Sequence, residues 1–223
     1  MAYRNRTRKS RTDRRQARRN QNMQWAAGGI ILVVLIIIGF VIYTNLPKKN
    51  TASGKKQWAS APPMTIDTSK QYFATVKMAK GSEFTIQLYP DKAPITVNSF
   101  VFLAKQGFFN GVTFHRVLDG FMAQGGDPTG TGSGGPGYEF VNESSDLKFD
   151  KAGVVAMANA GKDTNGSQFF ITFGPQPQLN GSYTIFGQVM SGMDVVNGLT
   201  RRDPQQSPTF AGDAMESVTI TVK

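Results

Sequence analysis

The chain has 223 residues, a formal net charge of +10, no cysteine and a single histidine, His115. The absence of cysteine excludes disulfides, thiolate nucleophiles and thiolate metal sites. With one histidine, a zinc site would need several carboxylates, and a serine hydrolase would have only this residue as its base. We therefore expect no metal and no cofactor. The length suits one domain with an appendage.

The positive charge is concentrated at the N-terminal end. Residues 1–50 contain eleven of the 25 Lys and Arg residues but only one acidic residue, Asp13, whereas residues 51–223 contain fourteen of each sign. The larger part of the chain is therefore neutral, and a nucleic-acid-binding function would depend on the basic tail alone. Because an apolar segment next to the tail explains its charge, no nucleic-acid partner is expected.

Residues 25–43, WAAGGIILVVLIIIGFVIY, carry no charge and are long enough for a helix that crosses the hydrocarbon core of a bilayer. Trp25 and Tyr43 stand at the two ends, where aromatic side chains favour the headgroup region. A cleaved signal peptide is one alternative, but its apolar region is usually shorter and is followed by small residues. A buried core helix is another. The pattern favours an uncleaved transmembrane helix.

The basic residues on the two sides of this segment predict its orientation. Nine Lys and Arg residues lie between Arg4 and Arg19, ahead of the segment, whereas Lys48, Lys49, Lys55 and Lys56 closely follow it. The positive-inside rule places the more basic side in the cytoplasm. We therefore expect a single-pass protein of the cell membrane, with its N-terminus cytoplasmic and its C-terminal domain extracytoplasmic.

The rest of the chain reads as a linker and one domain. The expected organisation is a basic cytoplasmic tail over 1–24, a transmembrane helix over 25–43, a flexible linker over 44–70 and a domain over 71–223. The linker assignment depends on a composition rich in Lys, Ser, Ala and Pro without a structural period.

Alternating apolar and polar residues predict a β-hairpin from the strands 72–78 and 83–89. Pro94 suits the first turn of a helix that continues with apolar residues at helical spacing and stops at Gly107. Further predicted elements are strands near 112–117, 153–158, 168–173 and 184–189, a helix at 193–199 and a last strand over 217–223. Many short strands with two helices indicate a closed antiparallel β-barrel with helical plugs.

Two segments carry the chemistry: FHRVLDGFMAQGGD at 114–127 and MANAGKDTNGSQFFI at 157–171. They resemble the signatures of the cyclophilin-type peptidyl-prolyl cis/trans isomerases, and the resemblance extends from Tyr72 to Lys223. The run GGDPTGTGSGG at 125–135 is similar to the short-loop, prokaryotic-like branch. The resemblance implies a mainly β fold, an eight-stranded closed antiparallel barrel capped by two helices, with its active site on the outer face.

The chemistry of such an enzyme can be argued from the bond it acts on. An X-Pro peptide bond has a rotation barrier of about 18–20 kcal/mol, because donation from nitrogen into the carbonyl is lost in the twisted transition state. A catalyst needs an apolar slot for the proline ring and a fixed donor to the prolyl nitrogen. Arg116 suits this role because its guanidinium is always charged, planar and multidentate. Outside such a motif, an arginine here would pair with Asp119 on the surface.

The resemblance assigns the remaining site residues. Gln124 joins Arg116 as a catalytic residue that orients the guanidinium or binds substrate backbone. The residues implied in substrate binding are Phe121, Met122, Phe170 and Leu179 in the proline pocket, Tyr183 beside it, and Ala158, Asn159, Ala160 and Gln168 in the groove for the residues before proline. In an unknown β-protein, core packing would be the default role for such apolar residues.

Two positions depart from the family pattern. Gln178 stands where many eukaryotic members have a tryptophan that contacts cyclosporin, and Tyr183 stands where a pocket histidine occurs. Isomerase activity is compatible with both, but cyclosporin binding is expected to be weak. The expected function is isomerisation of X-Pro bonds in proline-containing polypeptides during the folding of extracytoplasmic proteins. The alternative is a non-catalytic adaptor or chaperone that binds proline-containing peptides.

Overall fold

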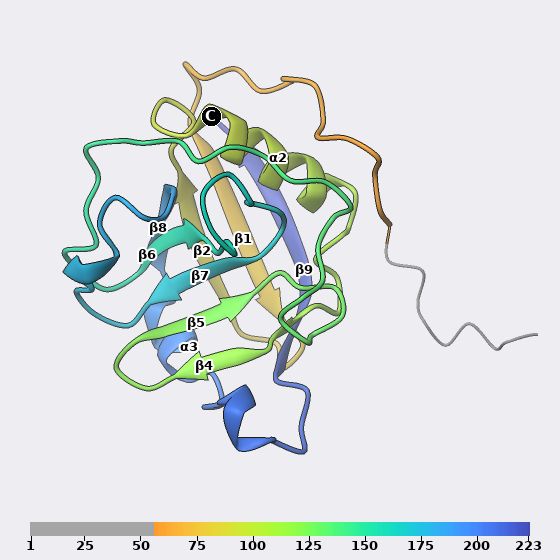
Figure 1. Cartoon of the computed structure of the whole chain (residues 1–223), viewed down its shortest axis with the longest axis vertical. Helices are drawn as coiled ribbons and strands as arrows, with labels where there is room; N and C mark the ends of the chain where they lie inside the picture. Colours follow the sequence, from red (N-terminus) through yellow and green to blue (C-terminus); the bar gives the residue numbers. More distant parts are fainter. Residues whose placement is uncertain (1–55) are drawn as a thin grey trace, which may run out of the picture. The chain divides into compact units, whose positions relative to one another are not determined.

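The computed structural model describes residues 56–223, which belong to a structural unit that begins at Gly54 (Figure 1). The expected basic tail over 1–24, the transmembrane helix over 25–43 and the first part of the linker lie outside the described residues. Within residues 56–223, no helix has the length and apolar character needed to span a bilayer.

The described residues form nine strands, two α-helices and two short 3-10 helices. The strands are β1 (Tyr72–Met78), β2 (Glu83–Leu88), β3 (Thr113–Phe114), β4 (Arg116–Leu118), β5 (Met122–Gly125), β6 (Val154–Met157), β7 (Phe169–Thr172), β8 (Ile185–Ser191) and β9 (Asp213–Val222). The helices are α2 (Pro94–Lys105), α3 (Met193–Asn197), η1 (Pro177–Leu179) and η2 (Pro204–Gln206). In Figure 1, α2 lies near one end of the barrel and α3 near the other.

The nine strands form one antiparallel sheet in the order β3-β9-β1-β2-β8-β6-β7-β5-β4. The two ends of this order are consecutive in the chain, because only His115 separates β3 from β4. β3 pairs with β9 and β4 with β5, and Val117 and Arg202 exchange two backbone hydrogen bonds of 2.7 and 2.8 Å. The sheet therefore curls into a nearly closed barrel.

This architecture confirms a mainly β antiparallel barrel with two helices and corrects its details. The single strand expected near 112–117 is divided at His115, because its two halves pair with strands at opposite ends of the sheet. Nine strands and near closure replace the eight strands and full closure that the family resemblance implied. β5 was not expected, since three of its four residues are buried and show no alternation.

Helix α2 begins at Pro94, as the sequence predicts, although no side chain of its own caps it. The first free backbone N–H groups are bound by a distant residue, Glu143, whose carboxylate accepts hydrogen bonds from Ile95 N at 2.9 Å and Thr96 N at 2.8 Å. A carboxylate suits this place because the N-terminus of a helix carries partial positive charge. The helix inserts Phe100 among Phe169 and Phe186 of the barrel interior.

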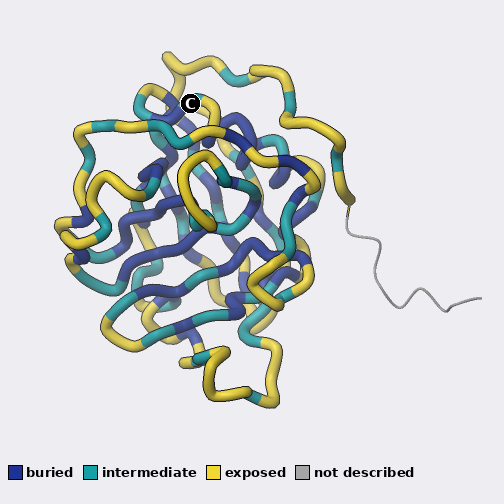
Figure 2. The backbone as a smooth tube through the Cα atoms, in the orientation of Figure 1, coloured by how far each residue is buried: buried dark blue, intermediate teal, exposed yellow. Residues whose placement is uncertain are grey.

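The strands that carry the candidate site are buried on both faces. Along β7, Phe169 and Ile171 point into the main core inside the barrel, whereas Phe170 between them belongs to a second apolar cluster. β6 follows the same alternation, because successive side chains of a strand point to opposite faces of the sheet. Figure 2 shows these central strands as mostly buried, with the exposed residues in the connecting loops. The second cluster therefore lies on the outer face of the barrel.

The described part of the expected linker lies against the domain from Lys56 onward. Trp58 packs edge-on against Phe102 of α2, with the ring centroids 5.1 Å apart, and its backbone N–H donates to the carbonyl of Pro136 at 2.9 Å. Further along, Thr65 N donates to Asn98 Oδ1 at 2.9 Å. Over these residues the segment is attached by packing and hydrogen bonds, which differs from the flexible linker expected over 44–70.

Candidate active site

Arg116 lies at the start of β4, directly opposite Gln124 of β5. Its guanidinium carbon lies 5.8 Å from the ring centroid of Phe121, and Nη1 lies 3.8 Å from Met122 Sδ. The side chain is half-buried. The short β4–β5 hairpin therefore holds a permanent positive charge beside an aromatic ring and a thioether, with donor groups still accessible to a ligand.

The apolar cluster beside Arg116 brings together the residues predicted for the proline pocket. Phe170 stacks on Phe149 with centroids 5.8 Å apart and meets Tyr183 edge-on at 5.4 Å. Of the residues predicted for the pocket, Met122 and Phe170 are buried, whereas Phe121, Leu179 and Tyr183 are partly exposed. The members are Met122, Phe149, Val154, Ala156, Phe170 and Ile185, with Leu118, Phe121, Leu147, Ala158, Leu179 and Tyr183 packed against them. The members that were not predicted are Leu118, Leu147, Phe149, Val154, Ala156 and Ile185.

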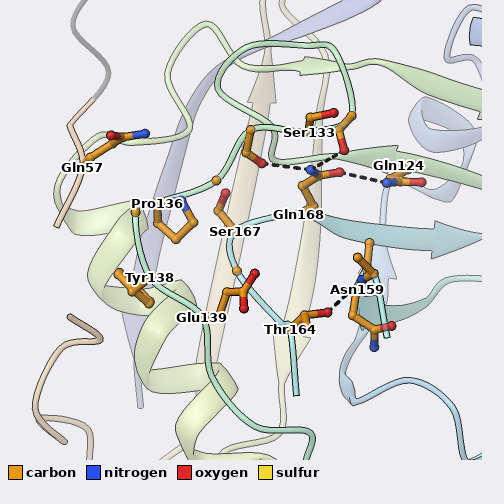
Figure 3. Close-up of a pocket in the computed structure, with 17 residues that line it drawn as sticks. Gln57, Gln124, Ser133, Pro136, Tyr138, Glu139, Asn159, Thr164, Ser167 and Gln168 are labelled. Carbon is orange, nitrogen blue, oxygen red and sulfur yellow. Dashed lines mark hydrogen bonds between the residues drawn. The ribbon is translucent and has the colours of Figure 1, made fainter. Parts of the chain in front are cut away.

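A polar cleft of about 750 Å³ adjoins this cluster (Figure 3). It contains the residues predicted for the groove before proline, namely Ala158, Asn159, Ala160 and Gln168, together with Gln124. Arg116 and the aromatic members of the apolar cluster do not line it. The predicted site residues thus form two adjacent groups, and Gln124 and Ala158 belong at their boundary.

Hydrogen bonds from glutamine side chains organise the cleft. Gln124 Nε2 donates to Gln168 Oε1 at 2.9 Å, and Gln168 Nε2 donates to the carbonyls of Gly132 at 3.0 Å and Gly134 at 2.9 Å. Gln124 therefore bonds to Gln168 here and not to Arg116. The network connects β5 to the glycine-rich loop and holds two of that loop's carbonyls, as the dashed lines in Figure 3 show.

The other side of the glycine-rich loop is held by Asp127, which is buried. Its carboxylate accepts hydrogen bonds from Thr129 N at 2.6 Å and Thr129 Oγ1 at 2.8 Å, and from Gly132 N. Burial acts to raise the pKa of Asp127, but the hydrogen bonds from Thr129, Gly134 and Gly132 outweigh it and lower the pKa. A Cβ at Gly134 would lie 2.1 Å from Asp127 Oδ1, so this approach requires glycine.

Asn159, which also lines the cleft, has backbone groups that are free to bind a ligand. Among residues 56–223, the N–H and C=O of Asn159 make no hydrogen bond, whereas Ala158 N is bound to Gln168 O at 2.9 Å and Ala160 N to Thr164 Oγ1 at 2.9 Å. A second cavity of about 450 Å³ lies beyond Asn159 and Tyr183. An extended peptide could therefore pair with Asn159 as an added strand does.

His115 and Gln178 belong to neither the apolar cluster nor the lining of the polar cleft. His115 is 2% exposed, and burial is the main cause that lowers its pKa, which favours the neutral ring. Gln178 is exposed on η1 and donates to Gln176 Oε1 at 2.7 Å. Within the described part of the chain, no group of three or more His, Asp or Glu residues is arranged to hold a metal ion.

Sequence reasoning missed part of the cleft lining: Gln57, Ser133, Tyr138, Glu139, Thr164 and Ser167. Tyr138 and Glu139 follow the glycine-rich run, so the run's proximity to the site was an available signal. Gln57 carried no signal, because it stands in a segment with no period and a linker-like composition.

Comparisons with known proteins agree with this geometry. The family model described as cyclophilin type peptidyl-prolyl cis-trans isomerase/CLD matches residues 73–221. Peptidyl-prolyl cis-trans isomerase B of Bacillus subtilis is 50% identical over 133 residues, which cover 59% of this chain and 93% of the relative. Peptidyl-prolyl cis-trans isomerase-like 1 of Mus musculus is 46% identical over 156 residues, which cover 67% and 92%.

Solved structures show the same likeness. A cyclophilin type peptidyl-prolyl cis-trans isomerase of Cryptosporidium parvum, crystallised in the presence of the dipeptide Ala-Pro, matches with a TM-score of 0.61 and 34% identity. The match covers 67% of this chain and 98% of that structure.

Proposed function

The chain belongs to the cyclophilin-type peptidyl-prolyl cis-trans isomerase family and is an isomerase of X-Pro bonds, and we propose that Arg116 is its transition-state donor. The observation that carries this proposal is the position of the Arg116 guanidinium, 5.8 Å from the Phe121 ring and beside Met122. A proline ring seated on the apolar cluster would bring the prolyl nitrogen within reach of this donor.

The reaction needs neither a nucleophile nor a proton transfer. Both planar forms of the X-Pro bond delocalise the nitrogen lone pair, whereas the twisted transition state localises it. A hydrogen bond from Arg116 to that lone pair is therefore stronger in the transition state than in either ground state, and such a difference accelerates the reaction. The half-buried position limits competition from water, which strengthens the electrostatic effect.

We assign Gln124 and the polar cleft to the peptide on the N-terminal side of the proline. The unpaired backbone of Asn159 supplies one donor and one acceptor for pairing with an extended chain. Gln124 lies opposite Arg116 in the hairpin and also lines the cleft. This position supports a role in keeping the X-Pro bond aligned between the two groups of residues.

Arg116→Ala tests the mechanism. Removal of the donor should lower kcat/KM by roughly a hundredfold, a cost on the order of 2–4 kcal/mol in transition-state stabilisation, while peptide binding changes little. NMR exchange spectroscopy on a blocked X-Pro peptide measures both the rate and the binding. Arg116→Lys should recover only part of the loss, because a point charge lacks the planar fork of the guanidinium.

The adaptor alternative predicts a different result. A non-catalytic peptide binder would keep peptide affinity in both proteins but would show no rate to lose in Arg116→Ala. Near wild-type kcat/KM in Arg116→Ala would instead move the catalytic role to another residue, with Gln124 the next to replace.

We also propose that residues 25–43 anchor the enzyme in the cell membrane and that the isomerase domain acts outside the cytoplasm. The uncharged length of this segment and the excess of Lys and Arg before it support this topology. Protease added to intact cells or to right-side-out vesicles should digest the domain. Protection until lysis would contradict the orientation.

We further propose that this enzyme binds cyclosporin weakly, because of the residue at position 178. Gln178 offers an amide where many relatives present an indole, and its Nε2 already donates to Gln176. Gln178→Trp should tighten cyclosporin binding with little change in kcat/KM, which titration and the same exchange measurement would show. Equal affinity in the two proteins would mean that this position does not control the inhibitor.

A further inference from the structure

The segment before the family domain reaches the polar cleft. The family model begins at residue 73, yet Gln57, sixteen positions earlier in the printed sequence, lines the cleft together with Pro136 and Tyr138. Figure 3 shows Gln57 and Gln124 at opposite sides of the cleft in that view. A residue outside the matched region therefore contributes to the surface that adjoins the X-Pro site.

The position of Gln57 is fixed by its neighbours on both sides. Lys56 Nζ donates to the carbonyl of Gln106 at 3.0 Å. Trp58 packs on Phe102 and also on Phe108, with centroids 6.0 Å apart in the second pair. Because Gln57 stands between two attached residues, its backbone is held at the rim of the cleft, and Gln57 lines the cleft.

Gly137 shows how closely this segment meets the cleft loop. A Cβ at Gly137 would lie 2.7 Å from Trp58 O and 3.1 Å from Gln57 Cβ, and its φ of +93° also favours glycine. The hydrogen bond from Trp58 N to Pro136 O lies beside it. The segment and the loop thus form one continuous wall.

The charge of the cleft indicates the side chain that it would accept. Apart from the phenol of Tyr138, whose hydroxyl lies 2.8 Å from Ser99 Oγ, the only ionisable side chain in the lining is Glu139. Glu139 is exposed and has no ion pair or side-chain hydrogen bond within residues 56–223. An unpaired carboxylate among neutral polar groups favours a cationic ligand side chain.

We propose that Gln57 is a specificity-determining residue and that the cleft, with Glu139, selects polypeptides that carry Lys or Arg on the N-terminal side of the proline. This inference rests on the proposed function, in which the residues before the proline occupy the cleft. The segment that joins the domain to the preceding chain is then also part of the substrate-binding surface.

Charge changes at Gln57 test the inference without removing any packing. The full chain, purified in mild detergent, is assayed by NMR exchange with the blocked peptides Lys-Ala-Pro-Phe, norleucine-Ala-Pro-Phe and Glu-Ala-Pro-Phe. The wild-type protein should prefer the Lys peptide over the Glu peptide. Gln57→Glu should raise this ratio of kcat/KM values by about threefold and Gln57→Lys should lower it by about threefold, as expected for exposed charge pairs.

Gln71 provides the matched control, because it is an exposed glutamine of the same N-terminal stretch that does not line the cleft. Gln71→Glu and Gln71→Lys make the same changes in net charge and should leave the ratio unchanged. Equal effects at positions 57 and 71 would overturn the inference. Glu139→Gln should lower the ratio, and an unchanged ratio there would overturn the cationic preference.

Detachment of the segment gives a second test. Trp58→Ala removes the packing on Phe102 and Phe108, so a charge at position 57 should lose most of its effect in the double variant with Gln57→Lys. An unchanged effect would mean that Gln57 acts without being held at the cleft, which contradicts the inference. If the wild-type protein did not isomerise the neutral norleucine peptide, the proposed function itself would be rejected. Failure of the proposed function can therefore be told apart from failure of this inference.

Discussion

The apolar cluster and the polar cleft adjoin each other but are built in different ways. The cluster takes alternate side chains from paired strands, so Met122 and Phe170 share a face because of sheet register. The cleft is lined mostly by loops, whose backbone is held by hydrogen bonds to Asp127 and Gln168. If the proposed roles hold, bond rotation depends on the strands and peptide selection on the loops, so changes in the loops could alter peptide selection without altering bond rotation.

After the loss expected for Arg116→Ala, the next largest effect should come from emptying the apolar cluster. Phe121→Ala removes a partly exposed ring that also faces Arg116, and the lost apolar contact with the proline ring is worth about 1.5–3 kcal/mol. We expect kcat/KM to fall by roughly tenfold or more for peptides of any length, chiefly through a higher KM. NMR exchange on blocked Ala-Pro and on a blocked tetrapeptide measures both cases.

Phe210→Ala is a suitable control for Phe121→Ala. Phe210 is 41% exposed and its ring centroid lies 5.9 Å from the guanidinium carbon of Arg202, so the aromatic–arginine geometry is nearly the same away from the site. The control should keep its kcat/KM. A similar loss in both variants would mean that the effect reflects general destabilisation.

A smaller effect is expected from the cleft, and it should depend on peptide length. Gln168→Met keeps the length of the side chain but removes the hydrogen bonds to Gly132, Gly134 and Gln124, each worth about 0.5–1.5 kcal/mol. We expect kcat/KM to fall by about fivefold for a tetrapeptide and by less for blocked Ala-Pro, which is too short to fill the cleft.

Gln188→Met controls for the loss of a partly buried glutamine hydrogen bond, because Gln188 Nε2 donates to Ala152 O at 2.9 Å outside the cleft. It should not alter the ratio between the two peptides. Equal losses for the short and the long peptide in Gln168→Met would contradict the division between cluster and cleft.

The parts of the fold with a clear local period could be predicted from the sequence. The β1–β2 hairpin shows alternation and α2 begins at its proline, so both were found. β5 could not be predicted, because burial on both faces removes the alternation. The division at His115 could not be predicted either, since it results from pairing with two strands far apart in the sequence.

In the candidate site, too, residues within a recognisable sequence pattern were predicted and residues placed by distant contacts were not. Family motifs in strands predicted the residues that now share the apolar cluster and much of the cleft, whereas their individual roles stay predictions. Gln57 was not predicted, because its position is set by contacts of Trp58 with Phe102 of α2, with Phe108 and with Pro136, which leave no local pattern. Contacts between distant segments explain most of what the sequence could not show.

The smallest expected effect concerns His115, which lies next to Arg116 and whose pKa is influenced by the Asp127 charge and by Arg202. Burial, the largest cause, lowers its pKa in the folded protein, so the unfolded chain takes up a proton first as the pH falls below about 6.5. Stability is therefore fully present above that pH and is lost as the pH falls toward the folded pKa, with a slope that cannot exceed about 1.4 kcal/mol per pH unit for one proton.

Urea unfolding followed by circular dichroism between pH 7.5 and 5 measures this slope. His115 is the only histidine of the chain, and Asp127, whose pKa is lowered from 3.8, titrates below this range. His115→Gln should therefore remove most of the slope. Because His115 belongs to neither the apolar cluster nor the lining of the cleft, its protonation should leave the ratio of short-peptide to long-peptide kcat/KM unchanged. A slope that persists in His115→Gln would mean that another group, not the buried ring, takes up the proton on unfolding.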